Sequence, residues 1–252
     1  MFAFKSCLYL FMVLSACYGA VDIKKYFKVC NRNAIDVNDC LTDAVKKGMA
    51  TMVNGIEELR VPPIDPYYQK EFRLDYQNNQ IAAKMVMKNI YVEGLKDAKV
   101  HDVRIRSDDD NFHLEIDLTS PKVVVNTEYF GEGQFNSLKI SAYGTSNTTM
   151  TDLVYTWKLD GVPEKIGSEQ YVRIKEFYMR PDVGSLVTVF NNDNPDSKEL
   201  TDLGTRFANE NWRVLYKELL PYAQANWNKI GSKVANKLFL KVPYDQLFPV
   251  SS

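Results

Sequence analysis

The sequence contains only two histidines, His101 and His113, among 252 residues. Histidine is the side chain most often used for acid–base catalysis near neutral pH, so this chain has little material for that chemistry. His113 lies on the polar side of a regular strand alternation and His101 lies near an expected hairpin. Neither has an evident catalytic partner in the sequence. A hydrolase that depends on these two residues is therefore the least favoured function.

Other signatures of catalysis and metal binding are also missing. Residues 184–186 lack the spacing of a nucleophile elbow, and residues 131–133 are too short for a dinucleotide fingerprint. The three aspartates at 108–110 lack the 12-residue calcium loop with its terminal Glu, so they indicate a charged hairpin tip. We expect no enzymatic activity, no cofactor and no metal.

Charge is nearly balanced, with 31 basic and 32 acidic side chains. A nucleic-acid partner would require a basic stripe, which this sequence does not have. Beyond the first twenty residues, no segment approaches the roughly 20 apolar residues that cross a bilayer, so we expect no stable membrane insertion. Transient contact with a membrane or a receptor stays open.

The N-terminus has the pattern of a secretory signal peptide at residues 1–19. Lys5 gives the positive region, residues 8–14 are apolar, and small residues follow, with cleavage after Gly19 or alternatively after Ala20. A membrane anchor is the alternative, but the apolar run is short for one. We expect residues 20–252 to form one extracellular domain, because no repeat, low-complexity tract or linker divides them.

Two of the four cysteines, Cys7 and Cys17, lie in the expected signal peptide. Cys30 and Cys40 remain, and two thiols ten positions apart in an oxidising compartment indicate a disulfide. Closing so small a loop stabilises the fold by about 3 kcal/mol in the loop-entropy model. A metal site is the weaker alternative, because neither histidine lies near Cys30.

An N-terminal helix is predicted to begin near Cys40, capped by Asn38 or Asp39, and to end at Gly55. One apolar face is expected to hold Leu41, Val45, Met49, Met52 and Ile56. The proline-rich segment 61–66 then excludes helix and central strand, and marks the passage to a different kind of structure.

Between residues 72 and 190 the apolar period is mostly two, which predicts antiparallel strands with one wet face. Turns are expected at 78–79, 107–111, 131–133, 144–148 and 160–161. The absence of helical segments between the strands excludes a parallel, Rossmann-type sheet. A sequon at Asn147, with Thr149 two residues later, falls in one of these expected turns and is a candidate glycosylation site.

The C-terminal residues 199–238 have the one-sided apolar spacing of an amphipathic helix much longer than three turns. Pro221 lies inside this segment and is expected to kink or divide the helix. The part before Pro221 should lie within the curve of the sheet, and the part after it should close one end.

The predicted fold class is therefore α+β, a strongly curved antiparallel sheet wrapped around a long C-terminal helix, with a short N-terminal helix. Such a sheet closed over a helix tends to leave an apolar tunnel, which is typical of a small-ligand site. The candidate ligand-binding residues are Met49, Met52, Phe72, Tyr76, Leu114, Ile116, Val125, Tyr129, Phe135, Ile140, Tyr143, Tyr155, Trp157, Phe207, Trp212 and Tyr216.

The chain resembles the insect takeout and haemolymph juvenile-hormone-binding proteins. The resemblance is carried by Phe27 and Cys30; Asn38, Cys40 and Leu41; Gly55, Ile56, Leu59, Val61, Pro62, Asp65 and Pro66; Asn89, Ile90, Gly94 and Leu95; Gly144 and Met150; Val189, Phe190 and Asn191; Leu200, Leu203 and Gly204; Asn209, Glu210, Asn211 and Trp212; Glu218, Leu219 and Pro221; and Val242, Pro243, Leu247 and Phe248. It implies a tubular lipid-binding-like fold, a hydrophobic tunnel, a disulfide between Cys30 and Cys40, and a secreted carrier of terpenoid, fatty or other lipophilic ligands.

The leading hypothesis is a secreted, non-catalytic carrier whose partner is a small lipophile. The alternative is a secreted signalling or interaction protein whose interior is filled by its own side chains. The two differ in one feature: the carrier has unfilled apolar space inside the sheet, whereas the interaction protein has an exposed apolar patch.

Overall fold

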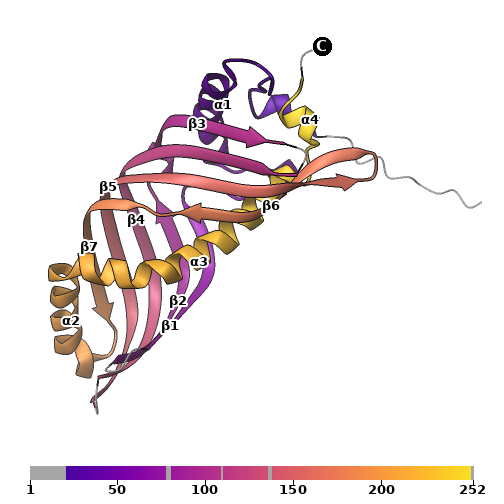
Figure 1. The fold of residues 1–252 in the computed structure, drawn as a ribbon. Coiled ribbons are helices and arrows are strands. Elements are labelled where there is room, and N and C mark those ends of the chain that lie inside the picture. The colour runs from indigo at the N-terminus through magenta and orange to yellow at the C-terminus, as the bar shows by residue number, and fades with distance from the viewer. Residues whose placement is uncertain (1–20, 78–80, 109, 136–137, 251–252) are drawn as a thin grey trace, which may run out of the picture.

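The computed structural model describes residues 21–77, 81–108, 110–135 and 138–250 (Figure 1). The expected signal peptide at 1–19 and the expected turn at 78–79 lie outside the described residues. A curved antiparallel sheet of seven strands lies against a long C-terminal helix, and an N-terminal helix packs at one end. The predicted fold class is confirmed.

The sheet follows the order β1-β2-β4-β5-β6, with β3 added to β4 and β7 added to β5. The whole of β4 pairs with residues 138–161 of β5; β2 and β3 pair with β4, β6 and β7 pair with β5, and β1 pairs with β2. The strands are β1 (Tyr67–Gln77), β2 (Ile81–Glu93), β3 (Lys99–Ser107), β4 (Phe112–Phe135), β5 (Leu138–Ile166), β6 (Glu169–Met179) and β7 (Asp182–Asn192).

Three of the expected turns are wrong, because β4 runs through 131–133 and β5 runs through 144–148 and 160–161. In the second and third of these segments, glycine allows close approach of a neighbouring strand instead of a chain reversal. A Cβ on Gly144 would lie 2.0 Å from the carbonyl oxygen of Asn191, and one on Gly161 would lie 2.8 Å from that of Arg173. The turn at 107–111 is confirmed: the Asp108 backbone N donates to the Asn111 carbonyl at 3.0 Å.

The face that β4 and β5 bury changes part-way along both strands. In β4 the buried side chains are even-numbered up to Ser120 and odd-numbered from Val123, while Pro121 is exposed. In β5 the change lies at Asp152, which has a positive φ of 54°. Pro121 and Asp152 lie opposite each other, because Ser120 pairs with Leu153.

This change of face divides the fold into two halves. The core half consists of residues 112–120 of β4 and 153–166 of β5, with β3 and β6. The β7 half consists of residues 123–135 of β4 and 138–150 of β5, with β1, β2 and β7.

In the described part of the chain, four α-helices and four short 3-10 helices accompany the sheet. The α-helices are α1 (Val37–Met52), α2 (Lys198–Glu210), α3 (Trp212–Phe239) and α4 (Tyr244–Leu247); the 3-10 helices are η1 (Ile23–Lys25), η2 (Glu57–Leu59), η3 (Leu95–Asp97) and η4 (Pro195–Ser197). None of the described helices is both long enough and apolar enough to cross a membrane.

Both predicted helix boundaries are corrected by the structure. The N-terminal helix begins at Val37, with Asp36 as the residue before it and no side-chain cap. The C-terminal segment divides at Asn211, where the backbone N and Nδ2 both donate to the Phe207 carbonyl and end α2. Pro221 does not divide the segment and lies inside α3, which packs along β6.

Amide side chains of α2 and α3 satisfy the backbone of the sheet edges. Asn236 accepts from the Ile174 N and donates to the Ile174 carbonyl of β6, both at 2.8 Å. Asn209 makes the same pair of bonds to Thr188 of β7, at 2.8 and 2.9 Å. Edge strands expose unpaired N–H and C=O groups that can pair with other chains. The amides of these helices bond to such groups, and the helices also cover the edges.

A third contact ties α3 to the opposite side of the sheet. Asn226 of α3 and Gln69 of β1 exchange hydrogen bonds between their amides, both at 3.1 Å. Asn228 of the same helix accepts from the Phe177 N of β6 at 3.0 Å. Because β1 and β6 are the two ends of the strand order, α3 bridges the gap between them across the concave face (Figure 1).

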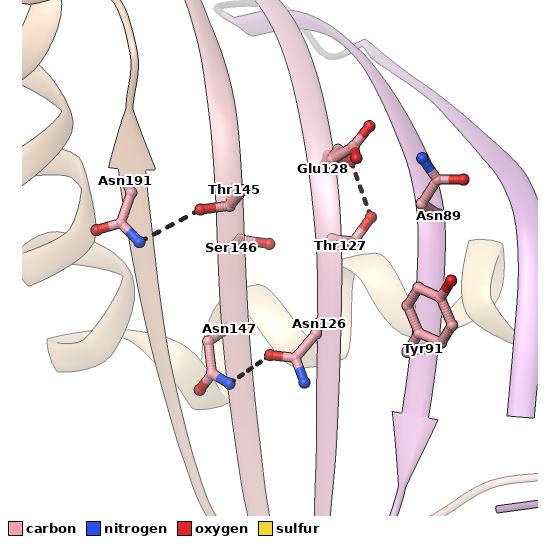
Figure 2. Close-up of a pocket in the computed structure, with 9 residues that line it drawn as sticks. All are labelled: Asn89, Tyr91, Asn126, Thr127, Glu128, Thr145, Ser146, Asn147 and Asn191. Carbon is pink, nitrogen blue, oxygen red and sulfur yellow. Dashed lines mark hydrogen bonds between the residues drawn. The ribbon is translucent and has the colours of Figure 1, made fainter. Parts of the chain in front are cut away.

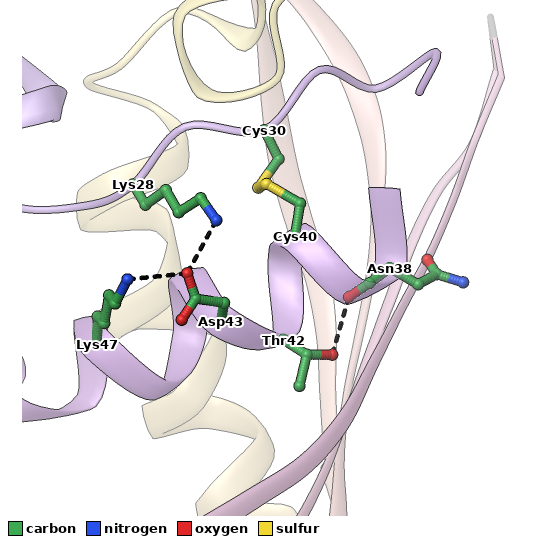
Figure 3. Close-up of a disulfide and its surroundings, with 7 residues drawn as sticks. All are labelled: Lys28, Cys30, Asn38, Cys40, Thr42, Asp43 and Lys47. Atoms are coloured by element: carbon green, nitrogen blue, oxygen red, sulfur yellow. Dashed lines mark hydrogen bonds and ion pairs between the residues drawn. A yellow bond between two sulfur atoms is a disulfide. The ribbon is translucent and has the colours of Figure 1, made fainter. Parts of the chain in front are cut away.

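The predicted disulfide between Cys30 and Cys40 is confirmed and fastens the N-terminal segment to α1 (Figure 3). Asp43 lies one turn further along α1 and forms ion pairs with Lys28 and Lys47, at 2.8 and 3.0 Å. The Thr42 hydroxyl accepts from the Val103 N of β3 at 3.0 Å, so α1 covers β3.

Charged side chains form a network where β3, β4 and β5 meet. Arg104 forms ion pairs with Asp102, Glu115 and Asp117, and Glu115 also pairs with Lys158 at 2.8 Å. The Lys158 ammonium and then the Arg104 guanidinium lower the pKa of Glu115 from 4.5 to about 2. The network joins three strands through side chains that are 19–50% exposed.

We predict that Asn236→Leu lowers the free energy of unfolding by about 2 kcal/mol, because it leaves the N–H and C=O of Ile174 without partners. Urea denaturation measures the change. Lys233→Leu, on the exposed side of the same helix, is the control and should shift stability by less than about 0.5 kcal/mol. Equal effects of the two variants would contradict the role of Asn236 at the edge.

We predict that Glu115 contributes stability above pH 4.5 that is lost as the pH falls toward 2, because its pKa is lower in the folded chain than in the unfolded chain. After discounting for solvent screening, the contribution is about 1 kcal/mol. Glu115→Gln should lower stability at pH 7 and flatten its pH dependence between these values. Glu176→Gln, at an exposed position of β6, is the control and should change stability at pH 7 by less than about 0.5 kcal/mol in the same denaturation series.

Candidate functional site

The core half of the sheet is filled by packed side chains. One cluster joins α1, β3, the core-half segments of β4 and β5, β6, the C-terminal part of α3, and α4. Phe112 is buried at its centre, with ring centroids of Phe239 and Phe248 at 5.3 and 6.0 Å. Side chains in such a cluster stabilise the fold by removing apolar surface from water.

Eight of the predicted ligand-binding residues belong to this cluster or pack against it. Four are buried within it, and four are partly buried at its margin. They are Met49, Leu114, Ile116 and Tyr155 in the first group, and Met52, Trp157, Trp212 and Tyr216 in the second. Their inward orientation agrees with the alternation in the sequence, and in this structure they contact one another.

The concave face of the β7 half is also apolar. Close to the core half, Val92, Val123, Met150, Val183 and Leu186 belong to the core cluster or pack against it, but the apolar set farther along the face belongs to neither of the two clusters of the described residues. Its members come from β1, β2, β4 and β7. Four were predicted from the sequence, Phe72, Tyr76, Val125 and Tyr129, and four were missed, Leu74, Met85, Met87 and Phe190. Cross-strand pairing brings them together: Met87 lies opposite both Phe72 and Tyr129, and the rings of Tyr129 and Phe190 are 5.2 Å apart.

The sequence contains a pattern that identifies three of the four missed residues. Met85 and Met87 alternate with Lys84 and Lys88, which is the period of a half-buried strand. Phe190 follows the same period in β7.

Apolar side chains of α2 and of the first half of α3 are exposed. Leu203 and Phe207 of α2 are 54% and 57% exposed, although they share one face with Leu200. In α3, Leu219 and Tyr222 are 39% and 36% exposed. The Tyr222 ring lies 6.3 Å from that of Tyr76, so this part of α3 faces the β7 half.

Two further predicted residues, Tyr143 and Phe207, belong neither to the core cluster nor to the concave face of the sheet. Tyr143 is wrong as an inward residue: it pairs with Phe130, and both are on the outer face with about 45% exposure (44% and 45%). Phe207 lies on α2. The side chains of Phe135 and Ile140 lie outside the described residues.

Hydroxyl groups lie among the apolar residues of the concave face. Thr127, Ser146 and Thr188 are buried in the β7 half, and the Thr188 hydroxyl is 2.9 Å from that of Thr148. At the boundary of the halves, the hydroxyls of Ser120 and Tyr155 are 2.8 Å apart, and burial raises the pKa of Tyr155. Burial likewise raises the pKa of Tyr216 to about 12.

The two histidines lie on strands and contact residues of neighbouring strands. His113 Nδ1 is 2.6 Å from Asp160 and its Nε2 is 3.2 Å from Glu115. His101 Nε2 is 2.8 Å from the Thr119 hydroxyl. Among the described residues, no group of three or more His, Cys, Asp or Glu side chains has the geometry to hold a metal ion.

A polar hollow of about 370 Å³ lies on the outer face of the β7 half (Figure 2). We call it the outer groove; its lining residues are Asn89, Tyr91, Asn126, Thr127, Glu128, Thr145, Ser146, Asn147 and Asn191. The helices lie behind the sheet in this view. Asn147 of the sequon was expected in a turn, but it lies in the middle of β5 and donates to Asn126 Oδ1 at 2.7 Å.

The family model for haemolymph juvenile hormone binding proteins matches residues 7–249. The chain belongs to this family. Members of the juvenile hormone binding protein and takeout family are non-catalytic binding proteins, and this agrees with the expectation that the chain is not an enzyme. An extracellular haemolymph family and a disulfide also fit an extracellular protein. No curated protein sequence matches this family member.

A solved takeout structure has the same fold. Takeout 1 of Epiphyas postvittana superposes with a TM-score of 0.69 at 23% identity, over 88% of this chain and 99% of that one. A lipopolysaccharide binding protein matches with a TM-score of 0.31 at 11% identity, over 77% of this chain and 39% of that one. The fold of this family member is therefore takeout-like.

Because the two halves are packed differently, we predict that replacing an apolar side chain by alanine lowers the free energy of unfolding by different amounts in each. Ile116→Ala, in the filled core half, should lower the free energy of unfolding by about 3–4 kcal/mol, because it leaves a cavity among packed neighbours. Met87→Ala, in the β7 half, should cost less than about 1.5 kcal/mol, because fewer packed neighbours surround it. Guanidinium denaturation of ligand-stripped protein measures both. Equal losses would mean that the β7 half is packed as tightly as the core half.

Proposed function

We propose that the protein is a secreted carrier that holds a small hydrophobic ligand between the concave face of its β7 half and the helices α2 and α3. Membership of the juvenile hormone binding protein family supports a lipophilic ligand. The proposal places that ligand at one end of the interior instead of along the whole of it.

One observation carries this placement. The concave apolar set that lies farther from the core half is outside the packed clusters, and apolar side chains of α2 and of the first half of α3, such as Leu203, Phe207 and Leu219, are exposed. A folded chain gains stability by burying apolar surface, so the exposed apolar side chains of α2 and α3, beside an apolar concave sheet, are surface available to a ligand. The core half has its own side chains in the corresponding place.

The chemistry of this face favours a long, neutral and mostly apolar molecule. Each buried methylene of a ligand contributes about 0.8 kcal/mol, so a terpenoid or fatty chain gains affinity without a charged anchor. Met85 and Met87 adapt their unbranched side chains to irregular shapes. The hydroxyls of Thr148 and Thr188 bond to each other, so one of the two keeps an O–H to donate to an ester, epoxide or hydroxyl of the ligand. A juvenile-hormone-like terpenoid meets this description, and so does a fatty ester.

The alternative function, a secreted interaction protein, is favoured by the exposed face of α2. Leu203 and Phe207 would then contact a protein partner instead of a ligand. The two functions predict different effects of mutations in the sheet. Binding of a lipophile depends on the concave face of β2, whereas a surface contact through α2 does not.

Two consecutive residues of β2 test the proposal. Met87 faces the helices and Val86 faces outward, where it pairs with Phe130. Met87→Glu should weaken binding of a fluorescent fatty acid by at least tenfold, because a charge would be buried beside the ligand chain. Val86→Glu should leave affinity within about twofold.

Displacement of the bound fluorophore by unlabelled farnesoid esters and fatty acids gives the affinities, and thermal melting confirms that both variants fold. Native mass spectrometry of protein purified from its secreting tissue should also show a bound lipophile. Equal affinities of the two variants would contradict the proposed site. Absence of binding by the wild-type chain would contradict the carrier function itself.

A further inference from the structure

A row of side chains crosses the outer face of the β7 half at one level of the sheet. Tyr68 of β1 lies opposite Tyr91 of β2, Tyr91 opposite Asn126 of β4, Asn126 opposite Asn147 of β5, and Asn147 opposite Val189 of β7. The row faces away from α3, because it alternates with Gln69, which bonds to that helix. Five strands therefore place two aromatic rings and two amides in line.

The next level of the sheet adds further polar groups to the outer groove. Glu128 lies opposite Thr145, and Thr145 lies opposite Asn191, which donates to the Thr145 hydroxyl at 3.3 Å. Asn89 lies beside them with a left-handed φ of 49°, and its Oδ1 accepts from the Tyr68 hydroxyl at 3.1 Å. The rings of Tyr68 and Tyr91 are 5.1 Å apart.

This combination suits a saccharide. Amides donate and accept hydrogen bonds at once, and a carboxylate accepts two or more, so together they match the hydroxyl and acetamido groups of a sugar ring. A tyrosine ring offers an apolar face on which the C–H face of a pyranose packs, and its hydroxyl adds a polar contact. The volume of about 370 Å³ is within the range of small-ligand pockets.

The sequon indicates which saccharide occupies the outer groove. Asn147 lies in the middle of the groove and Thr149 lies two residues further on the same face, as strand geometry requires. Their side chains are close, with Thr149 Oγ1 3.4 Å from Asn147 Oδ1. We propose that Asn147 carries an N-linked glycan and that the outer groove holds its first N-acetylglucosamine between Tyr91 and Asn191.

The covalent step is compatible with the hydrogen bond that Asn147 makes. The Nδ2 atom loses one proton and bonds to C1 of the sugar, while the pyrophosphate of a lipid-linked oligosaccharide donor leaves with its bonding electrons. One N–H stays on Nδ2. That N–H still donates to Asn126 Oδ1, which is 2.7 Å away in the unmodified chain. The bond thus fixes the direction in which the sugar leaves the strand (Figure 2).

The neighbouring surface gives the glycan a second role. Val187 and Val189 of β7 are 50% and 46% exposed on the outer face, opposite Thr149 and Asn147. A glycan on Asn147 covers this pair, and it blocks association through an apolar surface. This inference does not depend on the lipophilic ligand, which is proposed for the opposite face of the sheet.

Intact-mass analysis of the chain secreted from insect cells tests the attachment. The wild type and Thr149→Ser should carry the mass of one N-glycan, because both keep the sequon. Thr149→Val, which has nearly the same shape, should lose it. A wild-type mass equal to that of the processed polypeptide would overturn the proposal, as would retention of the glycan by Thr149→Val.

Release by peptide N-glycosidase under native conditions tests the groove. The glycan should be released from the native wild type at least tenfold more slowly than from native Tyr91→Ala. After denaturation, both proteins should release the glycan at the same rate. Tyr91→Phe keeps the ring and should keep the protection. Tyr178→Ala removes a similarly exposed tyrosine from β6, and should behave as wild type.

Thermal melts identify a variant that fails to fold; in that case Asn191→Ala replaces Tyr91→Ala. Equal native release rates for the wild type and a folded groove variant would show that the glycan is attached to Asn147 but is not bound in the outer groove. That result would overturn the proposal that the groove holds the first sugar.

Discussion

The pairing of β4 with β5 is the constraint on which the rest of the molecule depends. The two strands stay in one register from Phe112 and Gly161 to Phe135 and Leu138, yet they change the buried face together at Pro121 and Asp152. Side chains alternate along a strand, and here the buried set changes from one alternate set to the other while the two strands stay paired. One continuous ladder therefore contributes buried side chains to both halves of the fold. The other strands attach to one or other part of this ladder, β1 through β2, and the two halves follow from it.

The two interiors are completed in different ways. In the core half, α1, the end of α3 and α4 fill the concave side with their own side chains. In the β7 half, α2 and α3 are held at the rim by amides, with Asn209 bonded to β7 and Asn226 bonded to Gln69 of β1. Hydrogen bonds at a rim fix a helix in place without requiring it to pack tightly on the sheet. This is how a stable fold leaves the apolar concave face of the β7 half for a ligand, as we propose.

The sequence predicted the fold class, the disulfide and the family, because periodicity, cysteine spacing and dispersed motifs are local or additive signals. It did not predict the length of β4 and β5, since Gly144 and Gly161 serve close strand contacts and not turns. It placed the helix division at Pro221 because local propensity favours a break there, whereas packing on β6 keeps α3 continuous and Asn211 ends α2. Alternation identified Phe72 and Tyr129 on the concave face. It could not separate them from Ile116 and Tyr155, because which inward residues find packed partners depends on contacts distant in sequence.

Carbon-13 NMR of methionine methyl groups tests the central claim most directly, because methionines occur in both halves. Met85 and Met87 lie on the concave face of the β7 half, while Met49 is buried in the filled core half. Titration of a lipophile into ligand-stripped protein should shift or broaden the Met85 and Met87 signals and leave that of Met49 unchanged. Substitution of each methionine in turn gives the assignments. A shift of Met49 with unchanged Met85 and Met87 would place the ligand in the other half and contradict the account.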